Sequence, residues 1–175
     1  MAEKARFTPD LITLKDPRSA AAEAYRTLRS NLVFSNLDAK LQRIALTSPA
    51  QQEDKSATLA NLAVTLAQSE HPTLLVDADL RRPAQHTLWG LDNARGLTSM
   101  VLEAQALAAP PIQPTGIPGL SVLTSGPLPP NPADVLASNK MEEVLTKLSS
   151  LATYVLFDVP PVLAASDAAV LGRKL

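Results

Sequence analysis

A lysine and a serine, Lys55 and Ser56, begin an apolar helical pattern and directly follow a polar loop of residues 47–54. A short apolar strand pattern, residues 43–46, precedes that loop. Strand, loop, Lys-Ser and helix follow the order of a phosphate-binding loop. In such a loop, backbone N–H groups bind the phosphates, the lysine contacts the β- and γ-oxygens, and the serine hydroxyl binds Mg²⁺. The chemistry that these residues could support is therefore the binding of a magnesium nucleotide.

Three aspartates end two further apolar segments. Asp77 and Asp79 close the segment 73–79, and Asp158 closes the segment 154–158. An acid in the place of Asp158 would hold a metal ion through water, while the other two could complete the metal shell or take a proton from an attacking hydroxyl. Because ligands of parallel sheets bind at the carboxyl ends of the strands, we expect these acids to lie beside the loop.

The elements that must position these residues alternate along the chain. Strand patterns that are apolar throughout are typical of a parallel sheet covered on both faces. The sequence therefore predicts an α/β fold of the P-loop NTPase type, a mostly parallel sheet between two layers of helices. The expected strands are residues 43–47, 73–79, 120–124 and 154–158, and the expected helices are residues 18–35, 55–69, 96–107, 133–150 and 166–174.

The composition narrows the classes of protein. With 175 residues and 46% apolar residues, the chain is long enough for one domain with a sizeable core. A net charge of −1 gives no overall basic field, so we expect no nucleic-acid partner. The absence of cysteine excludes disulfides and thiol chemistry, and the two histidines lie too far apart in sequence to suggest a metal site.

The loop departs from the phosphate-binding pattern at its glycine positions. Asp54 stands directly before Lys55, where the pattern asks for glycine, and Pro49 stands at the first glycine position. A Cβ at position 54 resists the backbone angles and the close phosphate approach that glycine permits. Its carboxylate also repels a polyanion, by about 1 kcal/mol in water and by several in a partly buried site. A loss of ~3 kcal/mol would weaken nucleotide binding about a hundredfold.

Several segments carry patterns that go beyond a generic phosphate-binding loop. Taken together, they resemble the bacterial tyrosine kinase (BY-kinase) family of capsule and exopolysaccharide synthesis, a deviant-Walker class of P-loop proteins. The resemblance covers about residues 16 to 172. It is carried by residues 23–32, 47–56, 61–63, 74–83 (Leu-Leu-Val-Asp-Ala-Asp-Leu-Arg-Arg-Pro), 96–98, 125–132 and 157–161 (Phe-Asp-Val-Pro-Pro).

The resemblance implies a role for each residue of the site. Lys55 and Ser56 match the Walker A residues, Asp77 and Asp79 the Walker A′ acids, and Asp158 the Walker B acid. ATP and Mg²⁺ are the implied cofactors, and Asp77 is the expected activator of a tyrosine hydroxyl. The full expectation is that Lys55 and Asp77 are catalytic, that Gln52, Glu53, Asp54, Lys55, Ser56 and Ala57 bind the cofactor, and that Ser56, Asp79 and Asp158 hold the metal.

Glu23, Arg26 and Arg29 match the Glu-x-x-Arg-x-x-Arg motif by which such kinases form rings and phosphorylate a neighbour's tail. At i, i+3 and i+6 of a helix, the three charges lie close to one face, which suits a subunit contact. The resemblance thus implies a ring-shaped homo-oligomer and a membrane-spanning polysaccharide co-polymerase partner. It also implies a cytoplasmic location, peripheral to the inner face of the membrane through that partner.

The chain differs from the family in three respects. The family loop reads Pro-Gly-Glu-Gly before Lys-Ser, where this chain has Gln-Gln-Glu-Asp in residues 51–54. The family's tyrosine-rich tail is not among these residues, whose only tyrosines are Tyr25 and Tyr154. Family members also continue with further strands and helices. We therefore expect an extended N-terminal arm, residues 1–17, followed by a domain, residues 18–175, that is truncated at its C-terminus.

Three functions remain open on these grounds. The first is a tyrosine-kinase-like domain that is weak or inactive in ATP binding and acts in assembly or regulation of polysaccharide synthesis. The second is an active ATP-dependent protein-tyrosine autokinase whose altered loop still binds nucleotide. The third is a switch of the chromosome-partition or septum-site ATPase type, against which the ring motif and the lack of a basic patch both argue.

Overall fold

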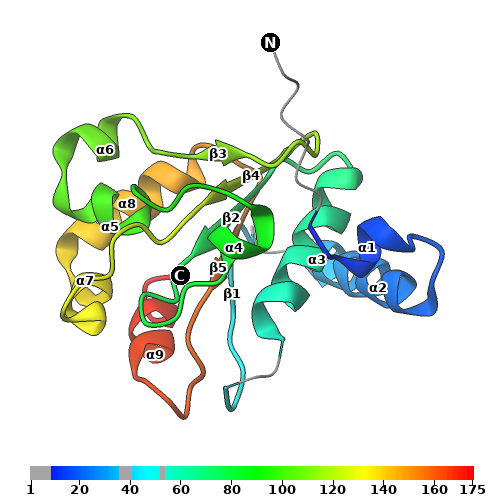
Figure 1. Ribbon diagram of the computed structural model, residues 1–175, viewed down its shortest axis with the longest axis horizontal. Helices are drawn as coiled ribbons and strands as arrows, with labels where there is room; N and C mark the ends of the chain where they lie inside the picture. The colour runs from blue at the N-terminus through cyan, green and yellow to red at the C-terminus, as the bar shows by residue number, and fades with distance from the viewer. Residues whose placement is uncertain (1–8, 36–40, 52–53) are drawn as a thin grey trace.

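The computed structural model describes residues 9–35, 41–51 and 54–175. Its centre is a five-stranded sheet in the order β1-β5-β2-β4-β3, in which β3 is antiparallel to β4 and the other neighbours are parallel (Figure 1). The strands are β1 (Arg43–Leu46), β2 (Thr73–Asp77), β3 (Gln113–Pro114), β4 (Leu120–Leu123) and β5 (Tyr154–Asp158).

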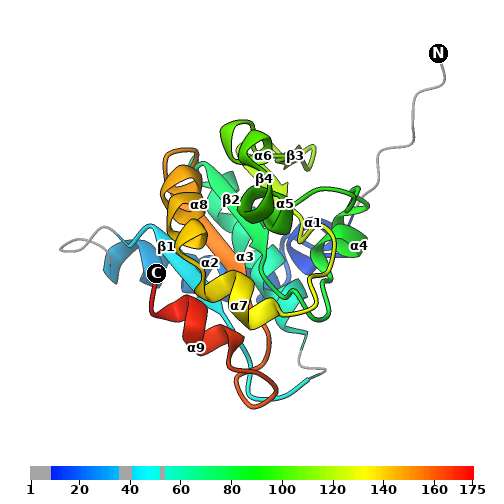
Figure 2. The same ribbon diagram turned by 90° about the vertical axis from the view of Figure 1, so that its left-hand side faces the viewer.

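Helices cover both faces of the sheet, so the predicted mostly parallel α/β sandwich is confirmed. Figures 1 and 2 show α1, α2 and α3 on one face and α5 to α9 on the other, with α4 beside α3. The helices are α1 (Ile12–Lys15), α2 (Ala20–Ser35), α3 (Lys55–Gln68), α4 (Gln85–Trp89), α5 (Leu97–Leu102), α6 (Ala104–Ala108), α7 (Pro132–Ala137), α8 (Asn139–Ser149) and α9 (Asp167–Gly172).

Alternate residues of the strands build two separate cores. Leu75 and Leu156 pack with α3, whereas Leu74 and Phe157 pack with the helices of the opposite layer. This division follows from the pleat, which turns successive side chains to opposite faces of a strand. Because both faces are covered, β2 and β5 are buried along their whole length, which explains their continuous apolar sequences.

The predicted long helix over residues 133–150 is divided at Ser138. The chain leaves the helical conformation there, and the Ser138 hydroxyl accepts a hydrogen bond from the backbone N–H of Met141, which caps the start of α8. The predicted helix over residues 96–107 is likewise divided at Glu103, whose backbone is extended. Neither break has a glycine or proline at the break itself, so helical patterning alone did not reveal it.

The described part of the predicted extended arm is folded against the domain. Residues 12–15 form the helical turn α1 rather than an extended segment. Thr13 donates from its backbone N–H and from its hydroxyl to Oδ1 of Asn61 in α3, at 3.0 and 2.8 Å, and Leu11 is fully buried. Residues 1–8 of the arm lie outside the described residues.

Candidate nucleotide-binding site

Three parallel strands bring the predicted site residues to one edge of the sheet. Leu46, the last residue of β1, is in register with Asp158 of β5, which is in register with Asp77 of β2. The loop after β1 and both strand-ending acids therefore meet at the carboxyl ends of the strands, where ligands of such sheets bind. The sequence predicted this convergence correctly.

Lys55 places a buried cation at this edge. Its Nζ pairs with Oδ1 of Asp158 and lies 3.5 Å from Oδ2 of Asp79. The side chains of Lys55 and Asp79 are each 9% exposed, and that of Asp158 is fully buried. A buried carboxylate is costly unless it is paired, so Lys55 offsets the charges of both acids in this structure.

Asp77 holds the start of α4. Its Oδ2 accepts hydrogen bonds from the backbone N–H groups of Ala84 and Gln85, at 3.0 and 2.9 Å, and its Oδ1 accepts one from the N–H of Asp79 at 3.3 Å. Burial, assisted by the negative charge of Asp158, raises the pKa of Asp77 to about 8, against the effect of these hydrogen bonds. Burial thus favours the protonated form of Asp77.

We expect Asp77→Asn to remove a pH-dependent part of the stability. The raised pKa of Asp77 means that the native state holds a proton that the unfolded chain has released, so this residue makes the free energy of unfolding fall as the pH rises from about 4 towards 8. The slope due to this residue is at most about 1.4 kcal/mol per pH unit. Urea denaturation of both proteins at several pH values should show a wild-type advantage at low pH that disappears or reverses at pH 8. Parallel curves would contradict this account.

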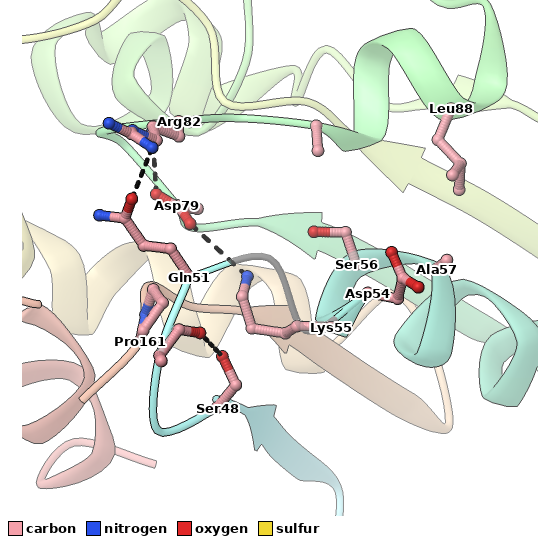
Figure 3. A pocket seen from close by; sticks show the side chains of 12 residues that line it. Ser48, Gln51, Asp54, Lys55, Ser56, Ala57, Asp79, Arg82, Leu88 and Pro161 are labelled. Atoms are coloured by element: carbon pink, nitrogen blue, oxygen red, sulfur yellow. Dashed lines mark hydrogen bonds and ion pairs between the residues drawn. The ribbon is translucent and has the colours of Figure 1, made fainter. Parts of the chain in front are cut away.

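A cavity of about 330 Å³ opens beside the lysine (Figure 3). Among the described residues, its lining includes Asp54, Lys55, Ser56 and Ala57 from the start of α3. Of the two acids expected to be the Walker A′ residues, Asp79 is among these lining residues and Asp77 is not. Arg82, Ala84 and Leu88, from the segment after β2 and from α4, also line the cavity.

Asp54 occupies the position that would belong to glycine. It is the N-cap residue of α3, with φ 45° and ψ 26°, and its side chain makes no capping hydrogen bond. The left-handed conformation costs an L-residue about 1–2 kcal/mol, though Asp tolerates it better than most. The predicted cofactor residues Gln52 and Glu53 lie outside the described residues.

The adjacent arginines of the segment after β2 have different partners. Arg81 makes two hydrogen bonds, at 2.8 and 2.9 Å, to the fully buried carboxylate of Asp167 in α9. Arg82 lines the cavity, and its guanidinium donates to Oε1 of Gln51 at 2.6 Å (Figure 3). The backbone N–H groups of both arginines donate to Oδ1 of Asp79, which fixes this turn at the cavity wall.

Sequence reasoning missed Gln85, a fully buried residue behind the cavity. Its Nε2 donates to Oδ2 of Asp158 at 2.7 Å and to the backbone oxygen of Ser56 at 3.1 Å. Gln85 begins α4, a helix of five residues, which is too short for a periodic pattern. A glutamine is usually exposed, and its burial here depends on partners that are distant in sequence.

The residues of the ring motif do not form one stripe of free charges. Arg26 pairs with Glu23 at 2.8 Å, within α2, and Glu23 remains 67% exposed. Arg29 donates to the backbone oxygen of Thr65 in α3 at 3.3 Å. Arg26 also donates to the backbone oxygen of Pro17. Glu23 is therefore exposed on α2, whereas Arg26 and Arg29 are half-buried and tie the helix to neighbouring segments.

The residues present fit a magnesium ion that is held mainly by phosphates and water. Within residues 9–35, 41–51 and 54–175, no three His, Cys, Asp or Glu side chains are arranged to hold a metal ion. Mg²⁺ in nucleotide sites commonly needs only one or two protein oxygens. Ser56 and Asp79, both at the cavity, suit this task, with Asp158 behind them.

Comparisons with known proteins identify the family. No protein-family model matches the sequence. The tyrosine-protein kinase YwqD of Bacillus subtilis is 42% identical over 168 residues, which cover 96% of this chain and 70% of YwqD. The chain belongs to the bacterial tyrosine kinase family. The putative tyrosine-protein kinase CapB of Staphylococcus aureus is 35% identical, over 99% of this chain and 75% of CapB.

Solved structures of this family share the fold. The kinase domain of the Escherichia coli tyrosine kinase ETK superposes with a TM-score of 0.91 at 33% identity, over 99% of this chain and 68% of that one. The chimerical protein CapA2B2 gives a TM-score of 0.88 at 38% identity, over 94% and 72% of the two chains. The septum site-determining protein MinD of Pyrococcus horikoshii, complexed with Mg-ADP, is 23% identical with a TM-score of 0.60 and shares the fold alone.

No helix in the described part of the chain is both long and apolar enough to span a membrane.

Proposed function

We propose that this chain is the nucleotide-binding domain of a protein of capsular or exopolysaccharide synthesis, and that its binding of MgATP is weakened by the loop before α3. Its role is then in assembly or regulation rather than in rapid phosphoryl transfer. The observation that carries the proposal is Asp54, a carboxylate in the left-handed conformation at the N-terminus of α3 and on the wall of the cavity. Anions bind at such helix starts, and a fixed negative charge there opposes them.

The remaining site residues support descent from a competent kinase. Lys55 would contact the phosphates, and Ser56, Asp79 and Asp158 would hold Mg²⁺. Asp79 is the acid at the cavity, so we assign to it both a place near the metal and the contact with an incoming tyrosine hydroxyl. We assign to Asp77 the positioning of α4, because its oxygens accept the backbone N–H groups described above.

The test of this proposal is a phosphotransfer assay. The wild-type chain is incubated with MgATP and a tyrosine-containing copolymer, and phosphotyrosine is measured beside the B. subtilis relative YwqD. We expect a rate at least a hundredfold below that of YwqD, in line with an estimated affinity loss of ~3 kcal/mol. A rate close to that of YwqD would support the second candidate, an active autokinase, which the retained lysine, serine and acids favour.

The partners of the chain follow from the same family. We propose that it forms a homo-oligomer through the outer face of α2 and works in the cytoplasm at the inner face of the membrane, beside a membrane-spanning co-polymerase. Glu23 supports this, because its side chain is two-thirds exposed and available to a neighbouring subunit. The chain's net charge of −1 gives no support to a nucleic-acid partner.

Light scattering tests the assembly. Arg26→Ala combined with Arg29→Ala should reduce the mass of the wild-type particle to that of smaller species, since it removes both basic groups of the motif. The control is Lys140→Ala combined with Lys147→Ala on α8, which removes two charges from the opposite layer of the molecule. Circular dichroism verifies that the double variant is folded, because Arg29 also contacts Thr65. An unchanged particle mass would exclude this surface.

A further inference from the structure

Gln85 links two parts of the site that are far apart in sequence. Its Nε2 reaches Oδ2 of Asp158, the last residue of β5, and the backbone oxygen of Ser56 in the first turn of α3. Its own backbone N–H is held by Asp77 at the end of β2. One buried residue thus contacts the Walker B acid, the Walker A helix and a Walker A′ acid.

The side-chain amide of Gln85 has one possible orientation. Its Oε1 accepts a hydrogen bond from the indole Nε1–H of Trp89, at 3.0 Å, one turn further along α4. An indole N–H can only donate, while a carboxylate and a backbone carbonyl can only accept. If the amide were flipped, its NH₂ group would face the N–H of Trp89, which places a donor against a donor. Its oxygen would then face the carboxylate of Asp158, which places an acceptor against an acceptor. Trp89 is 3% exposed, so water does not readily replace this bond.

The two oxygens of Asp158 are consequently divided between two partners. Oδ1 pairs with Lys55, at the cavity side, and Oδ2 accepts from Gln85, behind it. We propose that Gln85 is a positioning residue that holds the carboxylate of Asp158 in the orientation a metal-bound nucleotide requires, and that Trp89 fixes Gln85 for this task. The inference rests on the proposed function in one respect, namely that the cavity takes a magnesium nucleotide.

The same helix turn borders the cavity. Ala84 and Leu88 of the α4 region line it, while Gln85 and Trp89 lie on the side of α4 that faces the core. A change at Asp158 therefore reaches the indole of Trp89 through a single amide, and hydrogen bonds in such chains polarise one another. Since Trp89 is the single tryptophan of the sequence, its indole N–H gives one resonance that can be assigned without ambiguity.

The first experiment needs no nucleotide. In ¹H–¹⁵N spectra of the ¹⁵N-labelled chain, Gln85→Met should shift the indole resonance and speed its hydrogen exchange, because it removes the acceptor. Asp158→Asn should also shift it, whereas the control Asp134→Asn, at an exposed position of α7, should not. An indole resonance that is insensitive to Gln85→Met or to Asp158→Asn would overturn the proposal.

The second experiment measures the metal-dependent affinity for ADP, by calorimetry with Mg²⁺ and with EDTA. The background is Asp54→Gly, in which we expect the loop to bind more tightly. Adding Gln85→Met should weaken MgADP binding about tenfold, as for other residues that orient a metal-holding acid, and should change metal-free ADP binding less than twofold. An equal loss under both conditions, or no loss, would overturn the proposal.

If the Asp54→Gly chain binds no ADP at all, the proposed function fails, and the indole resonance alone decides the role of Gln85.

Discussion

Replacing Asp54 with glycine is expected to tighten the binding of MgADP about a hundredfold, or ~3 kcal/mol. Two effects contribute. Glycine adopts φ 45° at no steric cost, and it removes a carboxylate from the start of α3 and from the cavity wall. Calorimetric titration of MgADP into both proteins measures the difference.

Two further variants separate the backbone effect from the charge. Asp54→Asn removes the charge and keeps a side chain that tolerates the left-handed conformation, so it should recover most of the electrostatic part. Asp54→Ala removes the charge but strains the backbone, so its affinity should lie below that of the asparagine variant. Equal affinities in wild type and Asp54→Gly would show that Asp54 is not what weakens the site.

Arg81→Met is expected to lower the free energy of unfolding by about 2–3 kcal/mol. Arg81 is the partner of Asp167, whose carboxylate is fully buried at the start of α9, and the two hydrogen bonds between them join α9 to the segment after β2. Loss of the guanidinium leaves that carboxylate buried without its cation. Because the Arg81 side chain is 44% exposed, water relieves part of the cost, so we place the effect below that of a fully enclosed pair.

The chain offers a matched control for this loss. Arg95 is 46% exposed, almost the same as Arg81, but its partner Glu103 is 50% exposed. Arg95→Met should therefore change the stability by less than about 1 kcal/mol. The double variant Arg81→Met with Asp167→Asn should recover much of the loss, because no charge is left buried. Urea denaturation measures all three, and similar losses for Arg81→Met and Arg95→Met would contradict the account.

The sequence was sufficient for the four parallel strands and for the edge on which the site lies, but it did not predict the two-residue antiparallel strand β3. Continuous apolar runs that end in Asp77 and Asp158 predicted two buried parallel strands. Because ligands of parallel sheets bind at the carboxyl ends of the strands, both acids were expected beside the loop that leads to Lys55. These predictions succeeded because strand burial follows from a local apolar pattern, and the parallel direction follows from the alternation of strands and helices along the chain.

What the sequence did not predict depends on contacts between distant residues. Arg81 and Arg82 are neighbours of the same type, yet one pairs with Asp167 and the other lines the cavity. The spacing of Arg26 and Arg29 predicted a common helix face, but packing of α2 on α3 gives Arg29 a partner of its own. Gln85 could not be found for the same reason, since its partner Asp158 is 73 residues away.

The central claim is that the cavity at the start of α3 is the nucleotide site of this kinase relative. The most direct test is a calorimetric titration of MgADP into Asp54→Gly and into Asp54→Gly combined with Lys55→Met. We predict clear binding to the first protein and a loss of at least about a hundredfold in the second, because we assign to Lys55 the contact with the phosphates. Equal binding to both would mean that the nucleotide binds elsewhere, and the claim would be wrong.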